Sequence, residues 1–457
     1  MSRQFFHIGA LVLTLASPLS EAAAPTQEKT LANGLKVVVQ EDHRAPVVVS
    51  QVWYRVGSSY ENVGHTGISH VLEHMMFKGT PKLGPGEFSK LIAAQGGEEN
   101  AFTTSDYTAY YQVIGANKLP LCFELEADRM QNLLVDDAEF KKEIRVVMEE
   151  RRWRTEDNPE AKTYERFLAS AFISHPDHNP VIGWMNDLEH LDSTHVRDWY
   201  KTWYKPNNAV VVVVGDVQTE QVFQLAERFF GPVAAGNVPT LPVPKEVEPL
   251  GERRLTVKVP AKLPALLMGF NVPTLTSADN KQEVYALRML AGILDGGESA
   301  RFATQLVRAQ QVAAGINTGY SGFDRGDALF MISAVPTQKH SMDELEKAIW
   351  QQIEKIKNDP ISADELQRVK AQIISSDVYK QDDIQHRAMQ IGTLEALGLG
   401  WRAQDEYTTA LQNISVEQIK AVAKKYLTHD RLTVARLDPQ PLSGKEPRSF
   451  VPTGPIR

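Results

Sequence analysis

Two histidines and a glutamate fall within the segment His70-Val71-Leu72-Glu73-His74. Residues i and i+4 of a helix share one face, so His70 and His74 could bind one zinc ion at about 2.0–2.1 Å. Glu73 projects near the same face, where a carboxylate can take a proton from a zinc-activated water as general base. A catalytic zinc site also needs a third protein ligand, with the fourth position left for water. Without that ligand the motif is ambiguous, because so short a string also arises by chance.

The acidic segment 139–154, which the sequence predicts to be helical, offers candidates for the third ligand. Its candidates are Glu139, Glu143, Glu149 and Glu150. Glu143 and Glu150 are seven positions apart and share a helical face, whereas Glu149 lies about 100° around the helix from Glu150. Residue chemistry alone does not choose among them. The competing interpretation is a solvated charged face, with basic partners at Arg145, Arg151 and Arg152.

The elements that must position these residues follow from local patterns. A strand is expected over 47–56, then a glycine-punctuated loop, then the motif helix over 68–77, whose apolar residues seat it in a core. Residues 100–113 are rich in Thr, Tyr and Phe and are predicted to form one strand. A helical period runs from 116 to about 153. The unbroken apolar run within 208–215 is typical of a strand buried on both faces.

Composition changes over 232–250, where prolines accumulate and aromatic residues are few. We expect this segment to be an interdomain linker. The order of strands and helices repeats in outline on its two sides, which predicts an α+β protein with two homologous domains, each a mainly antiparallel sheet flanked by helices. The predicted division is a signal peptide over 1–22, domains over 23–231 and 251–440, and a tail over 441–457.

Charge and the N-terminus limit the function classes. The 457 residues carry a net charge of −8, which argues against a nucleic-acid surface. Arg3 precedes a short apolar run, 8–16, and small residues follow, a pattern typical of a signal peptide cut after Ala22. The run is too short for a stable membrane span. Cys122 is the only cysteine, so no intrachain disulfide can form.

The motif His70-x-x-Glu73-His74, followed by Met75-Met76-Phe77-Lys78-Gly79-Thr80, resembles the signature of the inverzincins, the pitrilysin and mitochondrial processing peptidase family. Further similar segments lie at 96–103, 204–209 and 213–216. The resemblance covers about 30–437 and is greatest to exported bacterial members with two homologous domains. It implies a clamshell half, one zinc ion per chain, and a location in the bacterial periplasm.

The resemblance also assigns residues. It implies Glu150 as the third zinc ligand, because the family glutamate follows the motif by about this distance, and Glu143 as its partner behind the metal. It implies that Asn100, Ala101, Phe102 and Thr103 form an edge strand that pairs with the substrate backbone.

The C-terminal half departs from the family pattern. Relatives carry an arginine and a tyrosine seven apart that reach the substrate carbonyl. Arg308 matches the arginine, but Gly315 stands at the tyrosine position, and Tyr320 is displaced by five residues. Two explanations compete: Tyr320 substitutes from a shifted loop, or a partner subunit supplies the pair, in a homodimer or in a heterodimer with a zinc-less homologue.

The resulting hypothesis is a zinc endopeptidase that cleaves peptides or unfolded polypeptides in a closed chamber. Alternatives are a zinc-bearing subunit inactive alone, a non-catalytic scaffold relative, and a metal-dependent hydrolase of other substrates. The complete set His70, Glu73, His74 and Glu150 favours the peptidase, since scaffold relatives usually lose it.

Overall fold

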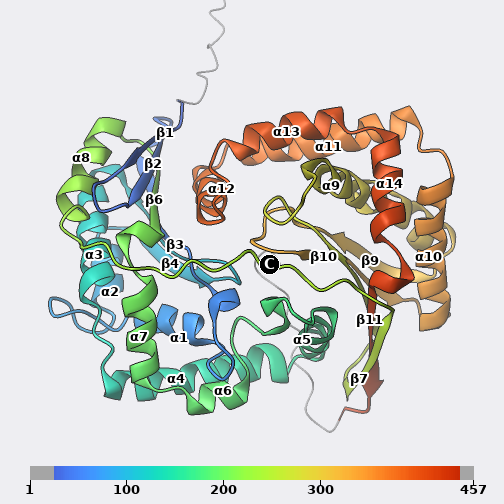
Figure 1. The fold of residues 1–457 in the computed structure, drawn as a ribbon, viewed down its shortest axis with the longest axis horizontal. Coiled ribbons are helices and arrows are strands. Elements are labelled where there is room, and N and C mark those ends of the chain that lie inside the picture. Colours follow the sequence, from blue (N-terminus) through green and yellow to red (C-terminus); the bar gives the residue numbers. More distant parts are fainter. Residues whose placement is uncertain (1–24, 443–457) are drawn as a thin grey trace, which may run out of the picture.

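A computed structural model describes residues 25–442 of the chain. The predicted signal peptide, including the cleavage position after Ala22, lies outside the described residues, as does nearly all of the predicted tail. Two mixed α+β halves lie side by side, each built on one sheet, as the sequence pattern predicts (Figure 1).

The N-terminal sheet has six strands in the order β1-β2-β6-β3-β5-β4, and only β2 and β6 run parallel. Its strands are β1 (Gln27–Thr30), β2 (Lys36–Glu41), β3 (Val47–Tyr54), β4 (Glu98–Thr103), β5 (Thr108–Gly115) and β6 (Ala209–Gly215). All seven residues of β6 are buried, as its unbroken apolar run predicts. The sheet ends at β4, which pairs only with β5.

The C-terminal sheet repeats this topology with five strands in the order β7-β11-β8-β10-β9. They are β7 (Arg253–Pro260), β8 (Ala265–Val272), β9 (Ala313–Gly319), β10 (Ala328–Pro336) and β11 (Leu432–Gln440). The parallel pair β7–β11 corresponds to β2–β6, and the edge strand β9 corresponds to β4. The shared order indicates two copies of one fold.

Helices cover both sheets. The N-terminal half contributes α1 (Ile68–Met75), α2 (Glu87–Ala94), α3 (Leu119–Asn132), α4 (Asp137–Arg151), α5 (Pro159–Ala171), α6 (Met185–His190), α7 (Ser193–Trp203) and α8 (Thr219–Phe229). The C-terminal half contributes α9 (Lys281–Asp295), α10 (Met342–Asn358), α11 (Ala363–Lys380), α12 (Ile384–Ala396), α13 (Ala403–Asn413) and α14 (Val416–Tyr426). Two π-helical segments occupy Arg152–Glu156 and Phe302–Ala309.

The two halves exchange one helix each. Helix α5 packs on β7, β8 and β11 of the C-terminal sheet, while α12 packs on β3 and β6 of the N-terminal sheet. Gly392 allows the close approach of α12, because a Cβ there would lie 2.0 Å from the Trp53 ring. Trp53 and Ala388 belong to the apolar cluster that this exchange buries. The halves are therefore joined through their cores as well as through the linker.

The proline-rich segment between α8 and β7 contains no helix or strand, yet it is anchored. The Glu246 carboxylate accepts hydrogen bonds from the backbone N–H groups of Ile173, Ser174 and His175. The Glu246 N–H in turn donates to Asp327 at 2.9 Å. This segment thus runs along both halves and contacts each of them.

The expectation of one strand over 100–113 is wrong, and β9 is a strand that the sequence pattern does not predict. Residues 100–113 form two strands, because the Thr104 hydroxyl accepts from the N–H groups of Asp106 and Tyr107 and turns the chain between β4 and β5. Strand β9 was not expected, because its sequence is rich in alanine and glycine. Helix α7 is capped by Asp192, whose side chain accepts hydrogen bonds from the N–H groups of Thr194 and His195.

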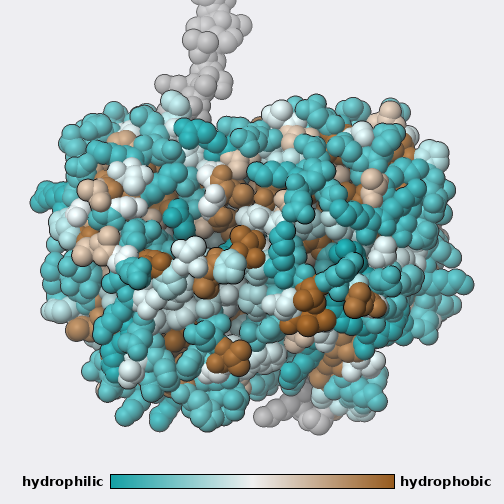
Figure 2. All heavy atoms as spheres, in the orientation of Figure 1, coloured by the Kyte–Doolittle hydropathy of each residue, from teal (hydrophilic) through white to brown (hydrophobic). Residues whose placement is uncertain are grey.

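The surface in Figure 2 is mostly hydrophilic, with small separated apolar patches. No helix within 25–442 combines the length and apolar character needed to cross a bilayer.

Candidate metal centre

The motif helix α1 is held firmly at its N-terminus. Gly67 adopts φ of 87° there, and a Cβ on it would lie 2.6 Å from the Ile182 carbonyl oxygen. The Glu61 carboxylate accepts hydrogen bonds from the N–H groups of Gly67 and Ser69, satisfying two donors of the first turn. Burial raises the pKa of Glu61 to about 8. Helix α1 also packs against α4, α7 and β4, so its polar face has a fixed direction.

His70, His74 and Glu150 come together between α1 and α4. Each offers one ligand atom, and these atoms all lie within 4.8 Å of one another. The His74 Nε2 atom lies 3.3 Å from Glu150 Oε2, and the His70 Nε2 atom lies 3.9 Å from it. Within 25–442 this is the only such group of three or more histidine, cysteine or acidic side chains.

The three donors fit a zinc ion. Ligands bound at about 2.0–2.1 Å in a tetrahedron lie roughly 3.3–3.5 Å apart, close to the separations around Glu150 Oε2. Two imidazole nitrogens and one carboxylate oxygen match the ligand set of catalytic zinc sites that keep one open position. Glu149, the neighbouring candidate, is instead exposed and paired with Arg152.

A second layer of polar side chains orients these donors. Glu143 Oε1 contacts His74 Nδ1 at 2.9 Å, so Glu143 directs the opposite ring nitrogen toward Glu150. The other oxygen of Glu143 pairs with Lys78 Nζ at 2.5 Å. The second oxygen of Glu150 pairs with the Arg154 guanidinium at 2.9 Å. His70 differs, because its Nδ1 is buried without a hydrogen-bond partner in the described part of the chain.

Glu73 lies beside the two histidines and outside the group of three ligand atoms. Its Oε2 accepts a hydrogen bond from the hydroxyl of Thr103, the last residue of β4. Burial raises the pKa of Glu73, while the Thr103 hydroxyl and His74 oppose that shift. A desolvated carboxylate with a raised pKa is a stronger proton acceptor than an exposed one.

The site is arranged to hold positive charge. Burial opposes the charged form of His74, but hydrogen bonds to Glu143 and Glu150 raise its pKa to about 9. Burial likewise opposes ionisation of Glu150, yet its contacts with His74 and His70 lower its pKa to about 2. Burial, and then the nearby His74, lower the pKa of His70 to about 4. Carboxylates that stabilise a cation at this point would equally stabilise a metal ion.

The structure places the predicted substrate residues on the edge strand of the N-terminal sheet. Asn100, Ala101, Phe102 and Thr103 belong to β4, whose outer edge has no strand partner within the described residues. Their side chains alternate between faces: Ala101 packs on the core that contains α1, and Phe102 packs on the opposite cluster with Trp53. The backbone edge of β4 is thus the one feature that all four positions share, and it is the feature that pairs with a peptide in β-augmentation.

Arg308 lies in the C-terminal half, and its guanidinium pairs with the exposed Glu298 at 2.7 Å. Gly315 lies on β9. The Tyr320 hydroxyl donates to the Pro273 carbonyl oxygen at 2.6 Å, and its ring stacks on Phe330. Both contacts of Tyr320 lie within the C-terminal half, and its hydroxyl is already engaged in a hydrogen bond.

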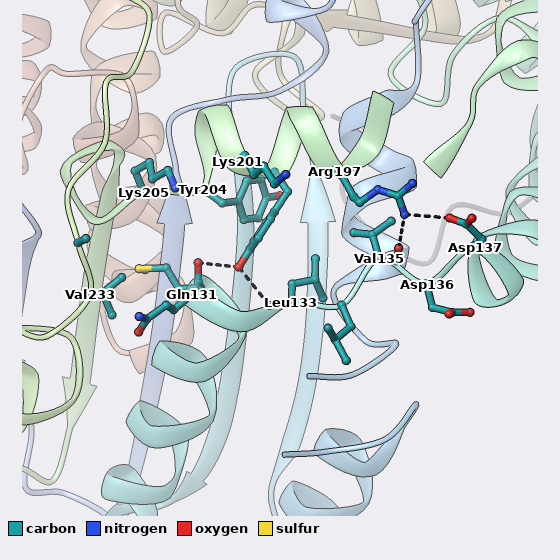
Figure 3. Close-up of a pocket in the computed structure, with 14 residues that line it drawn as sticks. Gln131, Leu133, Val135, Asp136, Asp137, Arg197, Lys201, Tyr204, Lys205 and Val233 are labelled. Carbon is teal, nitrogen blue, oxygen red and sulfur yellow. Dashed lines mark hydrogen bonds and ion pairs between the residues drawn. The ribbon is translucent and has the colours of Figure 1, made fainter. Parts of the chain in front are cut away.

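A cavity of about 680 Å³ contains none of His70, His74 and Glu150 in its lining. It lies between the turn after α3, helix α7 and the start of the linker (Figure 3). Its polar groups are largely paired within the fold: Tyr200 donates to the Met130 carbonyl oxygen, and Arg197 pairs with Asp137. A smaller cavity, about 570 Å³, includes Glu150 in its lining.

Sequence reasoning missed Lys78, Arg154 and the contact of Thr103 with Glu73. Signals for the first two were present, because Lys78 follows His74, and Arg154 follows Glu150, by four residues. No local pattern indicates the third contact, since it joins residues 30 positions apart.

Comparison with known proteins agrees with this geometry. The family model described as "Insulinase (Peptidase family M16)" matches residues 36–183, and the model described as "Peptidase M16 inactive domain" matches residues 190–373. The chain is also 32% identical over 440 residues to "Zinc protease PqqE" of Helicobacter pylori, which covers 94% of this chain and 97% of that protein. This chain belongs to peptidase family M16. The sequence-based recognition of a pitrilysin-like peptidase is thereby confirmed.

Other relatives extend the family assignment. "Uncharacterized zinc protease YmxG" of Bacillus subtilis is 25% identical, over 88% of this chain and 95% of that protein. Among solved structures, "a protease from Helicobacter pylori" superposes with a TM-score of 0.85 at 29% identity, covering 91% of this chain and all of that one. This agreement confirms the predicted two-domain α+β fold of the family.

The "periplasmic protease PqqL from Escherichia coli" shares the fold at 16% identity and a TM-score of 0.77. The match covers 93% of this M16 chain but 50% of that one. One PqqL polypeptide is thus about twice as long as the fold described here.

Proposed function

We propose that this M16 chain is a zinc-dependent endopeptidase that cleaves peptides or unfolded polypeptides. The observation that supports this most directly is the convergence of His70, His74 and Glu150 beside a separate buried carboxylate, Glu73. A scaffold protein would not need a general base at such a site. The names of the relatives, zinc proteases, point to the same chemistry.

The chain's own residues supply binding and proton transfer. A bound zinc ion would supply Lewis acidity toward water and the scissile carbonyl. The edge of β4 would align an extended peptide by backbone hydrogen bonds, which tolerate many side chains. Glu73 would accept the proton of the attacking water and deliver it to the leaving amine. Glu143 would keep His74 in the productive ring orientation.

Two substitutions on separate residues test this proposal. Glu73→Gln should retain zinc and abolish cleavage of an unstructured peptide, because an amide cannot accept the proton. Glu150→Gln should lower zinc content, whereas the matched control Glu149→Gln should retain both zinc and activity. Wild-type cleavage by a zinc-loaded Glu73→Gln protein would refute the assignment of the base.

We further propose that the working unit contains a second chain, either another copy or a zinc-less homologue. Support comes from Gly315 at the expected tyrosine position and from Tyr320, whose hydroxyl is bonded to Pro273. The double length of the PqqL chain is consistent with two such folds enclosing one chamber. Peptide cleavage measured against protein concentration, with sedimentation in parallel, tests this. Full activity of a monodisperse monomer would contradict it.

We propose export to the bacterial periplasm. The N-terminal pattern ending at Ala22 supports it, and so does the periplasmic location named for the structural neighbour. Fractionation of cells, with mass spectrometry of the mature N-terminus, would test both the location and the cleavage position.

A further inference from the structure

The cavity of about 680 Å³ on the N-terminal half has none of the metal-binding residues in its lining (Figure 3). Its walls are helix α7, the turn that follows α3 and the first residues of the linker. Small-molecule sites typically occupy about 300–1,000 Å³, so this cavity has the size of a ligand site. The proposed peptidase chemistry does not use it, and the chemistry of its lining therefore indicates what else this chain could bind.

Much of the lining is apolar. The rings of Tyr200 and Tyr204 contribute to it, and both hydroxyls already have partners: that of Tyr200 donates to the Met130 carbonyl oxygen, and that of Tyr204 contacts the Tyr110 hydroxyl at 2.9 Å. Leu134 is 49% exposed although it stands among other apolar groups. A hydrocarbon group placed here would remove apolar surface from water. The aliphatic side chains of the lining are Met130, Leu133, Leu134, Val135, Val233 and Ala234.

The acidic side chains of the lining are already engaged. Asp136 caps α4 and accepts hydrogen bonds from two backbone N–H groups of its first turn. Asp137 accepts from the Ser193 hydroxyl at 2.6 Å and from the Arg197 guanidinium at 2.8 Å. The pairing of Asp137 with Arg197 also accounts for one positive charge of the lining. The remaining charges of the lining are both positive.

These remaining charges belong to Lys201 and Lys205, whose ammonium groups have no ion pair or hydrogen bond within residues 25–442. Lys201 lies in the last turn of α7, and Lys205 follows the end of the helix by two residues. A Cβ on Gly236 would lie 2.8 Å from Cγ of Lys205, so the stem of this lysine lies against the linker. In Figure 3, Lys205 stands at the end of the cavity away from Asp137. The cavity thus combines apolar walls with unpaired positive charge.

We propose that this cavity binds a small amphipathic anion of the fatty-acid type, with its carboxylate paired to Lys201 and Lys205 and its hydrocarbon chain against the apolar walls. Lysine ammonium groups form charge-assisted hydrogen bonds with carboxylates, and burial of the chain adds apolar contact. A peptide fits this lining less well, because each amide group left without a partner costs free energy. Among the other polar side chains of the lining, only Gln131 lacks a partner within the described residues.

The competing role for these lysines is interaction with the dipole of α7, since cations near a helix C-terminus are stabilising. The chain offers a matched control for that role. Lys424 is exposed in the last turn of α14, which precedes β11 as α7 precedes β6. Lys424 does not line the cavity. A substitution there removes a lysine from an equivalent helix end and leaves the proposed site intact.

The test measures binding of octanoate, below its micelle concentration, to the zinc-loaded full chain by titration calorimetry. Octanoate should bind at one site per chain, and 1-octanol, which lacks the charge, should bind about tenfold more weakly. Lys201→Gln and Lys205→Gln should each weaken octanoate binding by about three- to tenfold, whereas Lys424→Gln should leave it unchanged. Ala234→Phe places a ring at an exposed position of the lining and should also weaken binding, because it fills the cavity.

Several results would overturn the proposal. They are the absence of saturable octanoate binding, equal affinities for octanoate and 1-octanol, and unchanged affinity in the variant that carries both Lys201→Gln and Lys205→Gln. Binding that disappears when zinc is removed and ignores both lysine substitutions would place the carboxylate on the metal instead. A peptide with a C-terminal leucine carboxylate is the last comparison: if it binds more tightly than octanoate and depends on the same lysines, the ligand is a peptide end. None of these measurements depends on whether the chain cleaves peptides.

Discussion

The Thr103 hydroxyl donates a hydrogen bond to the Glu73 carboxylate, so the last residue of the edge strand β4 contacts the expected general base. The strand proposed to bind substrate and the helix that carries the base are thereby joined by a side-chain contact. A displacement of β4 would therefore also displace the Glu73 carboxylate. The same hydrogen bond holds Glu73 in position relative to a peptide aligned on β4.

Thr103→Val should lower kcat while zinc stays bound. The substitution keeps the shape of the side chain and removes the donor to Glu73, leaving the carboxylate less well placed. We expect a loss of about tenfold in kcat, which corresponds to about 1.4 kcal/mol for a hydrogen bond to a charged group. Thr103→Ser retains the hydroxyl and should recover most of the rate. An unchanged kcat in Thr103→Val would show that this hydrogen bond does not position the Glu73 carboxylate.

Glu143→Gln should weaken zinc binding without removing a ligand. Glu143 contacts His74 Nδ1 and Lys78, so its neutral replacement orients the imidazole less strongly and leaves Lys78 without its ion pair. Partners of this kind typically contribute 10–100-fold to metal affinity. Competition with a chelator measures the effect. The same substitution at Glu139, one turn earlier on α4 and paired with Lys142, is the control and should leave affinity unchanged.

Some features of the fold were predictable because they are local. The helix that carries His70 and His74 follows from apolar periodicity, and β6 follows from its run of valines. The exchange of α5 and α12 was not predictable, since each helix has an ordinary amphipathic pattern that does not say which sheet it covers. Contacts such as that of Trp53 with Gly392 join residues hundreds of positions apart.

The metal site was likewise predictable only in its local part. Their spacing placed His70 and His74 on one helical face, but residue chemistry alone left four glutamates open as the third ligand: Glu139, Glu143, Glu149 and Glu150. The family resemblance, not the residues themselves, selected Glu150, and the structure places its carboxylate beside both histidines.

Arg325→Ala should weaken the contact between the two halves of the protein. Arg325 lies between β9 and β10 and donates to the Pro242 carbonyl oxygen of the linker at 2.7 Å. Its guanidinium lies 4.2 Å from the centre of the Tyr60 ring. Its backbone N–H donates to Asp106 at 2.8 Å, a bond that alanine would keep. Loss of the side chain should lower the free energy of unfolding by about 1–3 kcal/mol. Calorimetry with Arg368→Ala as the exposed control checks this; an unchanged Tm would contradict it.

Asp324→Asn should change how stability depends on pH. Burial, followed by the nearby Asp106, raises the pKa of Asp324 to about 7, compared with about 3.9 for an unfolded aspartate. A group whose folded pKa is raised contributes stability that is full below the unfolded pKa and is lost as pH rises through the folded pKa. For Asp324 that window runs from about pH 4 to about pH 7. Asparagine stays neutral throughout and does not incur this loss.

The Tm of Asp324→Asn minus the Tm of the wild type should therefore increase from pH 4 to pH 7 and become constant above it. Taking the difference cancels the groups that titrate independently of Asp324, such as His70 and His74. Asp279, whose side chain is fully exposed, provides the control Asp279→Asn, for which the difference should stay flat. A difference for Asp324→Asn that stays constant, or falls, across this range would mean that Asp324 is ionised in the folded protein. Ionisation of Asp324 at the junction between the two halves would then not lower the stability of the folded protein.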